Sequence, residues 1–219
     1  MMYKPFVNNR SQFGQDMFLF HQYFKHQKDG FFVDIGAYDG LSFSNTFLYE
    51  KEFSWKGICI EPIPEIFSEL RKNRDCLCIQ GGIAGIEEEE VPFLSVTPNN
   101  GFAQMLSGII GKQDPRLRSY IEEETRALAV PYQEIKIKTF RIDSLLKLYD
   151  VRHIDFVSLD TEGGELEILE SWNFDLYPVE ILCVENNYSD PNIMHFLKSK
   201  GFTYITNLQQ DEIYKKNGF

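Results

Sequence analysis

The sequence predicts an α/β fold in which helices cover both faces of a mostly parallel β-sheet. Short runs rich in β-branched and aromatic residues alternate with segments of helical periodicity, which is typical of successive βαβ units. The runs are apolar throughout, as expected for strands that are buried on both faces. Right-handed crossovers then bring the carboxyl ends of the parallel strands to one edge, where ligands of such folds bind.

The expected strands and helices follow one another in a regular order. The strand-like runs occupy residues 31–35, 57–61, 76–80, 154–160, 180–185 and 202–206. The helical patterns occupy residues 42–52, 64–73, 144–150, 165–172 and 191–200. Ser42 is expected to cap the first of these helices, Pro64 suits the first turn of the second, and Gly201 ends the last.

We expect a single domain over residues 1–219, because the chain is long enough for one core and has no low-complexity linker. Residues 1–30 are expected to form an N-terminal helical cap, and residues 83–143 interrupt the βαβ order. That interruption contains two strand-like runs, a polar loop and a charged helix, at 91–96, 134–140, 99–101 and 114–129. We interpret it as an insertion on the substrate side of the ligand edge.

The composition excludes some classes of partner. The balance of 22 basic against 33 acidic residues gives a formal net charge of −11, which opposes binding to phosphates, so we expect no nucleic-acid partner. The chain shows no apolar run that could span a bilayer or act as a secretory leader, and we expect a soluble, cytoplasmic protein. Cys59, Cys76, Cys78 and Cys183 lie in apolar runs, so we expect buried thiols rather than disulfides.

The segment D-I-G-A-Y-D-G, which starts at Asp34, follows the first expected strand. It lacks the G-x-G-x-x-G spacing of dinucleotide sites, and an acidic residue there repels a diphosphate but suits a ligand with an ammonium group. Glu61, at the end of the second strand, can accept hydrogen bonds from a ribose diol. Gly81 and Gly82, before Ile83, leave room for a flat adenine. This order of groups indicates S-adenosylmethionine, and a strand-turn-helix without a ligand is the alternative.

Several motifs of the chain resemble those of the FkbM-type S-adenosylmethionine-dependent methyltransferases. In chain order they are S-Q-F-G-Q-D from Ser11, F-V-D-I-G-A-Y-D-G from Phe32, S-N-T from Ser44, W-K-G-I-C-I-E-P from Trp55, M-L-S-G from Met105 and S-L-D-T-E-G-G-E from Ser158. The resemblance implies a class I methyltransferase fold, which is Rossmann-like, with a mostly parallel seven-stranded sheet. It also implies methyl transfer, since members of the family mostly methylate hydroxyl oxygens of sugars and polyketides.

The resemblance further implies a set of cofactor-binding residues. Asp34, Gly36 and Gly40 would surround the methionyl part of S-adenosylmethionine, and Glu61 would bind its ribose. The full expected set is Gln12, Asp34, Gly36, Ala37, Gly40, Ser44, Asn45, Glu61, Pro62, Gly81, Gly82, Ile83 and Asp160. The run Gln80-Gly81-Gly82 departs from the small polar-alanine run that is usual in the family. Gln12 and Gln15 either help to close the pocket or belong to an N-terminal helix cap.

Acidic residues also stand at the ends of the fourth and fifth expected strands. Asp160 and Glu162 follow the fourth strand, and Glu185 and Asn186 end the fifth, so the sheet brings them together. We expect Asp160 and Glu162 to be catalytic, orienting or deprotonating an acceptor hydroxyl. Asp160, Glu185 and Asn186 are expected to bind Mg²⁺ or Mn²⁺, by analogy with catechol-type O-methyltransferases. The alternative is that Asp160 caps the helix beginning near Gly164.

We therefore expect an S-adenosylmethionine-dependent O-methyltransferase that acts on a hydroxyl group, with a sugar or glycan as the favoured acceptor. A polyketide or another small-molecule alcohol is the alternative acceptor. A nicotinamide oxidoreductase is the rival enzyme, which the missing third glycine and Asp34 oppose. A nucleoside-binding protein without activity is the rival outside the enzymes.

Overall fold

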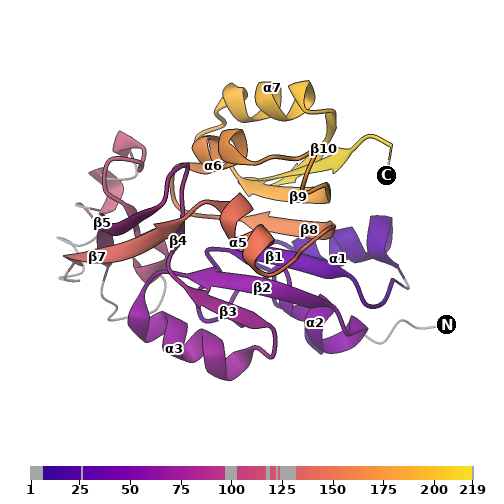
Figure 1. Cartoon of the computed structure of the whole chain (residues 1–219), viewed down its shortest axis with the longest axis horizontal. Coiled ribbons are helices and arrows are strands. Elements are labelled where there is room, and N and C mark those ends of the chain that lie inside the picture. The colour runs from indigo at the N-terminus through magenta and orange to yellow at the C-terminus, as the bar shows by residue number, and fades with distance from the viewer. Residues whose placement is uncertain are drawn as a thin grey trace.

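The structure is a computed structural model, and it describes residues 7–25, 27–96, 103–116, 119–121, 123 and 132–218. Within these residues a seven-stranded sheet has the strand order β10-β11-β9-β8-β1-β2-β3 (Figure 1). The strands are β1 (Phe31–Ile35), β2 (Lys56–Glu61), β3 (Leu77–Gln80), β8 (Ile154–Leu159), β9 (Val179–Glu185), β10 (Phe202–Leu208) and β11 (Asp211–Lys216). Every neighbouring pair is parallel except those made by β11 with β9 and with β10. The predicted fold class is confirmed.

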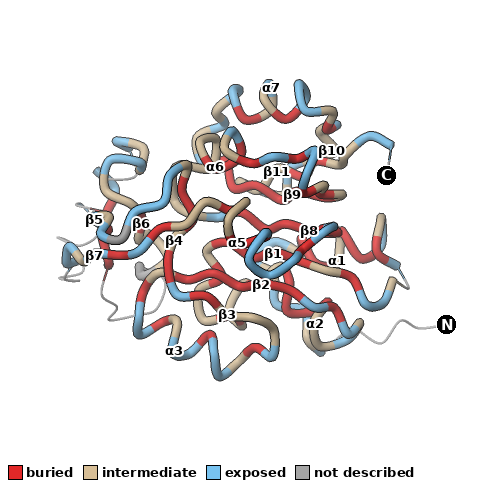
Figure 2. The backbone as a smooth tube through the Cα atoms, viewed as in Figure 1, coloured by how far each residue is buried: buried red, intermediate tan, exposed pale blue. Residues whose placement is uncertain are grey.

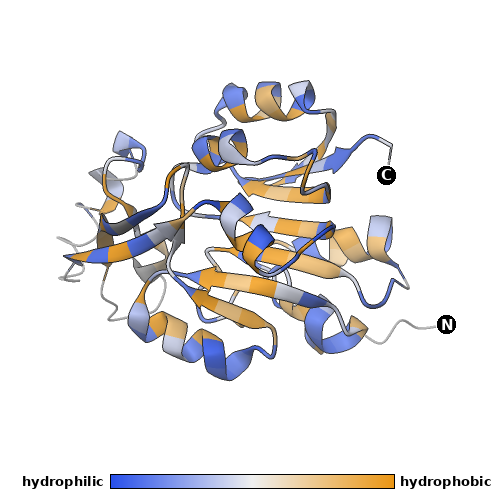
Figure 3. Cartoon of the chain, in the orientation of Figure 1, coloured by the Kyte–Doolittle hydropathy of each residue, from blue (hydrophilic) through white to orange (hydrophobic). Residues whose placement is uncertain are grey.

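Helices cover both faces of this sheet. They are α1 (Gln15–Leu19), the π-helix η1 (Phe20–Phe24), α2 (Phe47–Phe53), α3 (Pro64–Asn73), α5 (Ile142–Leu148), α6 (Glu165–Ser171) and α7 (Pro191–Ser199). Apolar residues of α5, α6 and α7 pack on one face, and those of α1, η1 and α2 pack on the other. The central strands β1, β2, β8 and β9 are therefore buried and mostly apolar, whereas α3 and α7 turn a polar side to the surface (Figures 2 and 3).

A second, four-stranded sheet lies at the end of the molecule away from both labelled termini (Figure 1). It has the order β4-β7-β5-β6 and is built from β4 (Gly82–Ile83), β7 (Tyr132–Phe140), β5 (Glu88–Val96) and β6 (Gly108–Ile109). A 3₁₀ turn, η2 (Ala103–Leu106), precedes β6. The expected loop Asn99-Asn100-Gly101 lies outside the described residues, and so does most of the helix expected over 114–129.

The first expected helix begins later than the sequence predicted. Ser42 was the expected cap, but α2 begins at Phe47 and has no side-chain cap. Asp39 instead accepts hydrogen bonds from the Ser42 backbone N–H and hydroxyl, both at 2.7 Å, and holds these residues in a turn. Thr46 then donates to Asp34 at 2.5 Å. The chain between Ser42 and Thr46 is therefore an ordered loop beside the end of β1.

The other helix signals have direct counterparts. Pro64 is the first residue of α3, and Pro191 is the first residue of α7. The Asp190 carboxylate caps α7 by accepting the Asn192 N–H at 3.0 Å. Gly201 follows α7 with a φ of 79°, a conformation that favours glycine at a helix end. Within the described residues no helix is long and apolar enough to cross a membrane.

Candidate active site

A deep pocket opens at the carboxyl edge of the main sheet, where β1, β2, β8 and β9 end, and the four-stranded sheet forms one of its walls. Its empty volume, with the open solvent at its mouth included, is about 1120 Å³. Expected cofactor residues that line it are Gln12, Asp34, Gly36, Ala37, Ser44, Asn45, Glu61, Pro62, Gly81, Gly82, Ile83 and Asp160.

The turn after β1 requires glycine at Gly36. Its φ is 82°, and a Cβ atom there would lie 1.7 Å from the Asp160 carbonyl oxygen. The Gly36 and Ala37 N–H groups donate to the Ile60 carbonyl at 3.1 and 3.0 Å, and Asp160 N–H donates to the Ile35 carbonyl at 3.0 Å. This close approach fixes the ends of β1, β2 and β8 against one another.

Asp34 lines the pocket, but its carboxylate also contacts two side chains of the protein. Besides the hydrogen bond from Thr46, its carboxylate lies 3.8 Å from the buried guanidinium of Arg74. Burial raises the pKa of Asp34, while Arg74 and Thr46 act to lower it. Asp34 therefore anchors the loop between Ser42 and Thr46 as well as facing the pocket.

Asn45 carries an unsatisfied polar atom at the pocket wall. Its Nδ2 donates to the Ser158 hydroxyl at 3.0 Å. Its Oδ1 is buried and has no hydrogen-bond partner among the described residues. Leaving a buried acceptor unpaired costs about 1–3 kcal/mol. Because Asn45 lines the pocket, a ligand donor that reached Oδ1 would remove this cost.

Glu61 is buried at the end of β2, and each of its carboxylate oxygens accepts one backbone N–H. Its Oε1 accepts the Ile63 N–H at 2.8 Å, and its Oε2 accepts the Tyr38 N–H at 3.2 Å. Burial raises the pKa of Glu61 to about 7, although these two backbone hydrogen bonds act to lower it. Each oxygen of a carboxylate can accept a second hydrogen bond. Glu61 can therefore bind a ligand diol without giving up its contacts with the fold.

The side of the pocket near Glu61 is apolar. Ile63 and Ile66 form a buried cluster with Phe93 of β5 and Ile137 of β7, and all four line the pocket. Gly82 and Ile83 lie beside the same wall, since β4 pairs with β7. These side chains form an apolar wall between α3 and the four-stranded sheet, which suits a flat apolar ring.

Three carboxylates gather at the other end of the pocket. Ligand oxygens of Asp160, Glu162 and Glu185 all lie within 4.8 Å of one another. Desolvation raises the pKa of Asp160 to about 7, with neighbouring carboxylates acting the same way and a hydrogen bond with Glu185 opposing them. Burial, reinforced by the charge of Asp160, also raises the pKa values of Glu162 and Glu185 well above their usual range. These groups can therefore hold protons near neutral pH or share a cation.

The turn after β8 does not use Asp160 as a helix cap. Helix α6 has Gly164 at its N-cap and no side-chain cap. Glu165 stabilises the turn instead, because its Oε1 accepts the Thr161 hydroxyl at 2.7 Å and the Gly163 N–H at 3.0 Å. Glu162 lies within this turn at a φ of 54°, an uncommon conformation for a residue other than glycine. The Asp160 side chain is therefore left facing the pocket.

Two expected residues are not brought to the pocket. The Asn186 side chain closes the loop after β9, donating to the Asp190 carbonyl at 3.2 Å and accepting its N–H at 2.7 Å. Glu162 joins Asp160 and Glu185 in the carboxylate cluster. Gly40 does not line the pocket either; a Cβ atom there would meet side chains of Leu70 and Arg74.

The pocket also contains residues that sequence reasoning did not single out. Asp211, at the start of β11, pairs in register with Glu185 and accepts a hydrogen bond from Gln15. Further pocket residues of this kind are Tyr38, Ser42, Phe43, Met105, Ser107, Ile109, Thr161 and Gln210. Gln12 and Gln15, which the sequence did indicate, both line the pocket, and α1 begins after Gly14 without a side-chain cap. The run F-T-Y-I-T-N-L-Q-Q-D, which ends at Asp211, could have been recognised as the first strand and turn of a β-hairpin. A hairpin there would have predicted that Asp211 lies near the end of the strand that contains Glu185.

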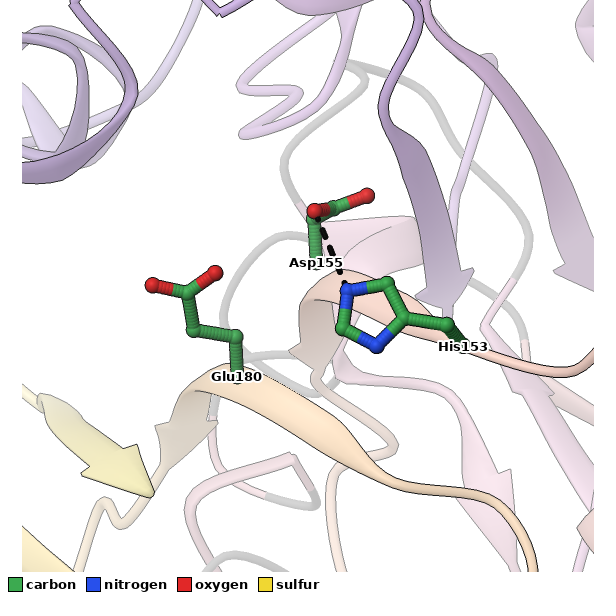
Figure 4. Close-up of side chains that lie close together, drawn as sticks. All are labelled: His153, Asp155 and Glu180. Carbon is green, nitrogen blue, oxygen red and sulfur yellow. Dashed lines mark hydrogen bonds and ion pairs between the residues drawn. The ribbon is translucent and has the colours of Figure 1, made fainter. Parts of the chain in front are cut away.

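A second cluster of titratable side chains lies at the amino ends of β8 and β9, outside the pocket (Figure 4). His153, Asp155 and Glu180 place ligand atoms within 4.8 Å of one another. Asp155 accepts from His153 Nε2 at 3.2 Å and from the Phe31 N–H at 2.7 Å. Glu180 pairs with Lys215 at 3.0 Å. These bonds tie the starts of β1, β8 and β9 to β11, which gives the group a stabilising role.

The strand order, in which β11 alone is antiparallel to its neighbours, is that of the class I methyltransferase fold. The family model described as the methyltransferase FkbM domain matches residues 34–204. The chain therefore belongs to the FkbM methyltransferase family, as its motifs predicted.

Comparison with solved structures finds other methyltransferases. A methyltransferase FkbM from Methylobacillus flagellatus KT matches with a TM-score of 0.51 and 15% identity, over 92% of this chain and 47% of that one. This chain thus spans about half the length of that relative. A human methyltransferase 10 domain containing protein has a TM-score of 0.44 and 11% identity, over 93% of this chain and 79% of that one. No curated protein is found to match.

Proposed function

We propose that the protein transfers a methyl group from S-adenosylmethionine to a hydroxyl of an uncharged polyol, with a sugar or glycan as the favoured acceptor. The observation that carries the proposal is that two acceptor residues line one pocket. Asn45 has an unsatisfied Oδ1, and Glu61 is a buried carboxylate at the end of β2. The cofactor carries an ammonium group and a ribose diol, which are the donors that these two acceptors need.

The pocket residues suit three parts of S-adenosylmethionine: its ammonium group, its ribose and its adenine. Asn45 Oδ1 would accept from the ammonium group of the methionyl part, and Glu61 would accept from the ribose hydroxyls. The wall formed by Ile63, Phe93 and Ile137 would cover the adenine. When bound, this cofactor supplies an electrophilic methyl group on a sulfonium.

The charges of the pocket limit the acceptor. Among the described residues its lining includes the carboxylates of Asp34, Glu61, Asp160, Glu162, Glu185 and Asp211, and no lysine, arginine or histidine. Such a lining disfavours phosphates, which argues against nucleic acid, sugar phosphates and a nicotinamide dinucleotide. Carboxylate and amide oxygens, the latter from Gln12 and Gln210, suit the hydroxyls of a neutral polyol.

The carboxylate cluster provides the proton acceptor for the reaction. A general base works best with a pKa near the working pH, and the pKa of Asp160 is raised to about 7. Asp160 and Glu162 would orient the acceptor hydroxyl and take its proton as the methyl group is transferred. The cluster also fits a hard divalent cation, since Asp160, Glu162 and Glu185 offer only carboxylate oxygens. Bound Mg²⁺ or Mn²⁺ would lower the pKa of the hydroxyl.

Labelled methyl transfer to a panel of acceptors tests the proposal. The panel contains neutral mono- and oligosaccharides, the matching sugar phosphates, a polyketide alcohol, a catechol and an aliphatic amine. We expect label on neutral sugars and little or none on sugar phosphates. Transfer to the amine alone would replace the hydroxyl acceptor with a cationic one, which the same acidic pocket also suits. Binding of the demethylated cofactor with no transfer to any acceptor would favour a nucleoside-binding protein.

A further inference from the structure

Three thiols lie together on one face of the main sheet, away from the active site. Cys59 is in β2, and Cys78 of β3 pairs with it in register. Cys76 lies in the bend just before β3, and its Sγ is 3.5 Å from Cys59 Sγ. Cys78 Sγ points to the Cys76 carbonyl oxygen at 3.6 Å. Cys59 and Cys76 are therefore in direct contact.

The two contacting thiols differ in their access to solvent. Cys59 is fully buried, whereas Cys76 is partly exposed and lines a surface pocket. Phe31 and Lys56, the first residues of β1 and β2, line the same pocket. This pocket thus lies at the amino edge of the sheet, opposite the carboxylate cluster. A small reagent can reach Cys76 from the surface but meets Cys59 only behind it.

The two thiols also differ in their ionisation. Hydrogen bonds from Cys59 and Cys78 lower the pKa of Cys76 to about 3, and the buried guanidinium of Arg74 acts in the same direction. Burial raises the pKa of Cys59 well above its usual range. A partly exposed thiol with a lowered pKa therefore lies against a buried thiol with a raised pKa. Reactive cysteines are partly exposed and have a lowered pKa.

We propose that Cys76 is a site of oxidation by hydroperoxides, and that Cys59 is the thiol that resolves the product into a disulfide. The Cys76 thiolate attacks one peroxide oxygen, the O–O bond breaks, and the departing oxygen takes a proton to leave water or an alcohol. Cys76 is then a sulfenic acid. The Cys59 sulfur, on losing its proton, attacks the Cys76 sulfur; the S–S bond forms, the S–O bond breaks, and water leaves.

The contact between the thiols is close enough for this second step. A disulfide needs a sulfur separation of about 2.05 Å, against 3.5 Å in the reduced protein. Cys76 lies in a bend and not in the β2–β3 ladder, whose pairs begin at Ile58 and Leu77. The bend can therefore move toward Cys59 without breaking strand pairing. This inference does not depend on the methyl-transfer proposal.

Treatment of the reduced full chain with hydrogen peroxide, followed by mass spectrometry without reductant, tests the inference. We expect loss of two hydrogen masses from the intact protein and a disulfide-linked peptide pair that contains Cys59 and Cys76. Cys76→Ser should remove the reaction. Cys59→Ala should stop it at a sulfenic acid, which dimedone traps, and its folding is checked by circular dichroism. Cys183→Ser, at a buried cysteine on another strand, is the control that should leave the disulfide unchanged.

A second measurement keeps the inference testable if the buried variant is unstable. Alkylation of the wild-type chain at mildly acidic pH should label Cys76 at least about tenfold faster than an ordinary thiol, whose pKa is about 8.5. Equal labelling of Cys76 and denatured-state cysteines, or peroxide oxidation that leaves Cys76 a thiol, would overturn the proposal. A disulfide between Cys59 and Cys78 would show that Cys78 is the oxidised residue instead.

Discussion

Replacing Glu61 with glutamine should weaken the binding of adenosine. Adenosine carries the ribose diol and the base but no ammonium group, so it reports on this end of the pocket alone. Each Glu61 oxygen already accepts one backbone N–H, from Ile63 or Tyr38, and has one further position for a ribose hydroxyl. A glutamine side chain offers one oxygen and one NH₂ group, so at least one hydroxyl loses its acceptor.

The expected loss follows from the charge of the lost acceptor. A hydrogen bond to a charged group contributes about 1.5–3 kcal/mol, which corresponds to roughly 10- to 150-fold in affinity. The binding should also depend on pH. Burial raises the pKa of Glu61 to about 7, and hydroxyl donors favour the ionised form. Adenosine affinity of the wild-type protein should therefore rise as the pH increases through about 7, and the variant should lack this rise.

Titration calorimetry with adenosine at several pH values and constant ionic strength measures both effects. Glu65→Gln is the matched control, because Glu65 lies exposed in the first turn of α3, outside the pocket lining. It should bind adenosine as the wild-type protein does. Equal affinity of Glu61→Gln and wild-type protein, or a pH dependence that survives the substitution, would refute the ribose assignment.

Four further outcomes are expected. Asn45→Ala should weaken binding of S-adenosylhomocysteine by roughly 10- to 150-fold but leave adenosine binding unchanged, as calorimetry would show; equal loss for both ligands would contradict the ammonium contact. Gly36→Ala should lower the free energy of unfolding by at least about 1–3 kcal/mol in denaturant titrations, because of its φ of 82° and the Asp160 carbonyl; unchanged stability would contradict the packing. The raised pKa of Glu61 means that the folded chain binds more protons than the unfolded chain between about pH 4.5 and 7, so stability should fall as the pH rises through this range. Mg²⁺ or Mn²⁺ should raise the melting temperature more at about pH 8 than at about pH 5, and an equal rise would argue against the cluster as the site.

The sequence could predict the parts of the site that follow from strand ends. Asp34, Glu61, Asp160 and Glu185 each stand at or just after the end of an apolar run, and parallel pairing brings those ends to one edge. Their types and order were enough to indicate the class of cofactor. This prediction did not require knowledge of side-chain contacts between segments that are far apart in the sequence.

Side-chain directions that depend on loops and long-range pairing could not be predicted in this way. The Asn186 side chain does not line the pocket, because its amide forms two hydrogen bonds with the backbone of Asp190, four residues later. Asp211 lies in the site because the antiparallel strand β11 pairs with β9, and it accepts a hydrogen bond from Gln15, which is 196 residues away in the sequence. The late start of α2 depends on the bond between Thr46 and Asp34. In each case tertiary contacts outweigh local signals.

Methyl transfer by Asp160→Asn tests the central claim most directly, because Asp160 joins the pocket to the carboxylate cluster. The change keeps the shape of the side chain and removes its charge, and α6 does not use Asp160 as a cap. Asp150→Asn, at an exposed loop residue paired with Arg152, is the control and should transfer methyl at the wild-type rate. We expect Asp160→Asn to bind S-adenosylhomocysteine but to transfer labelled methyl to the preferred acceptor roughly 10²-fold more slowly or worse. Transfer at the wild-type rate would contradict the assignment of this carboxylate to the reaction.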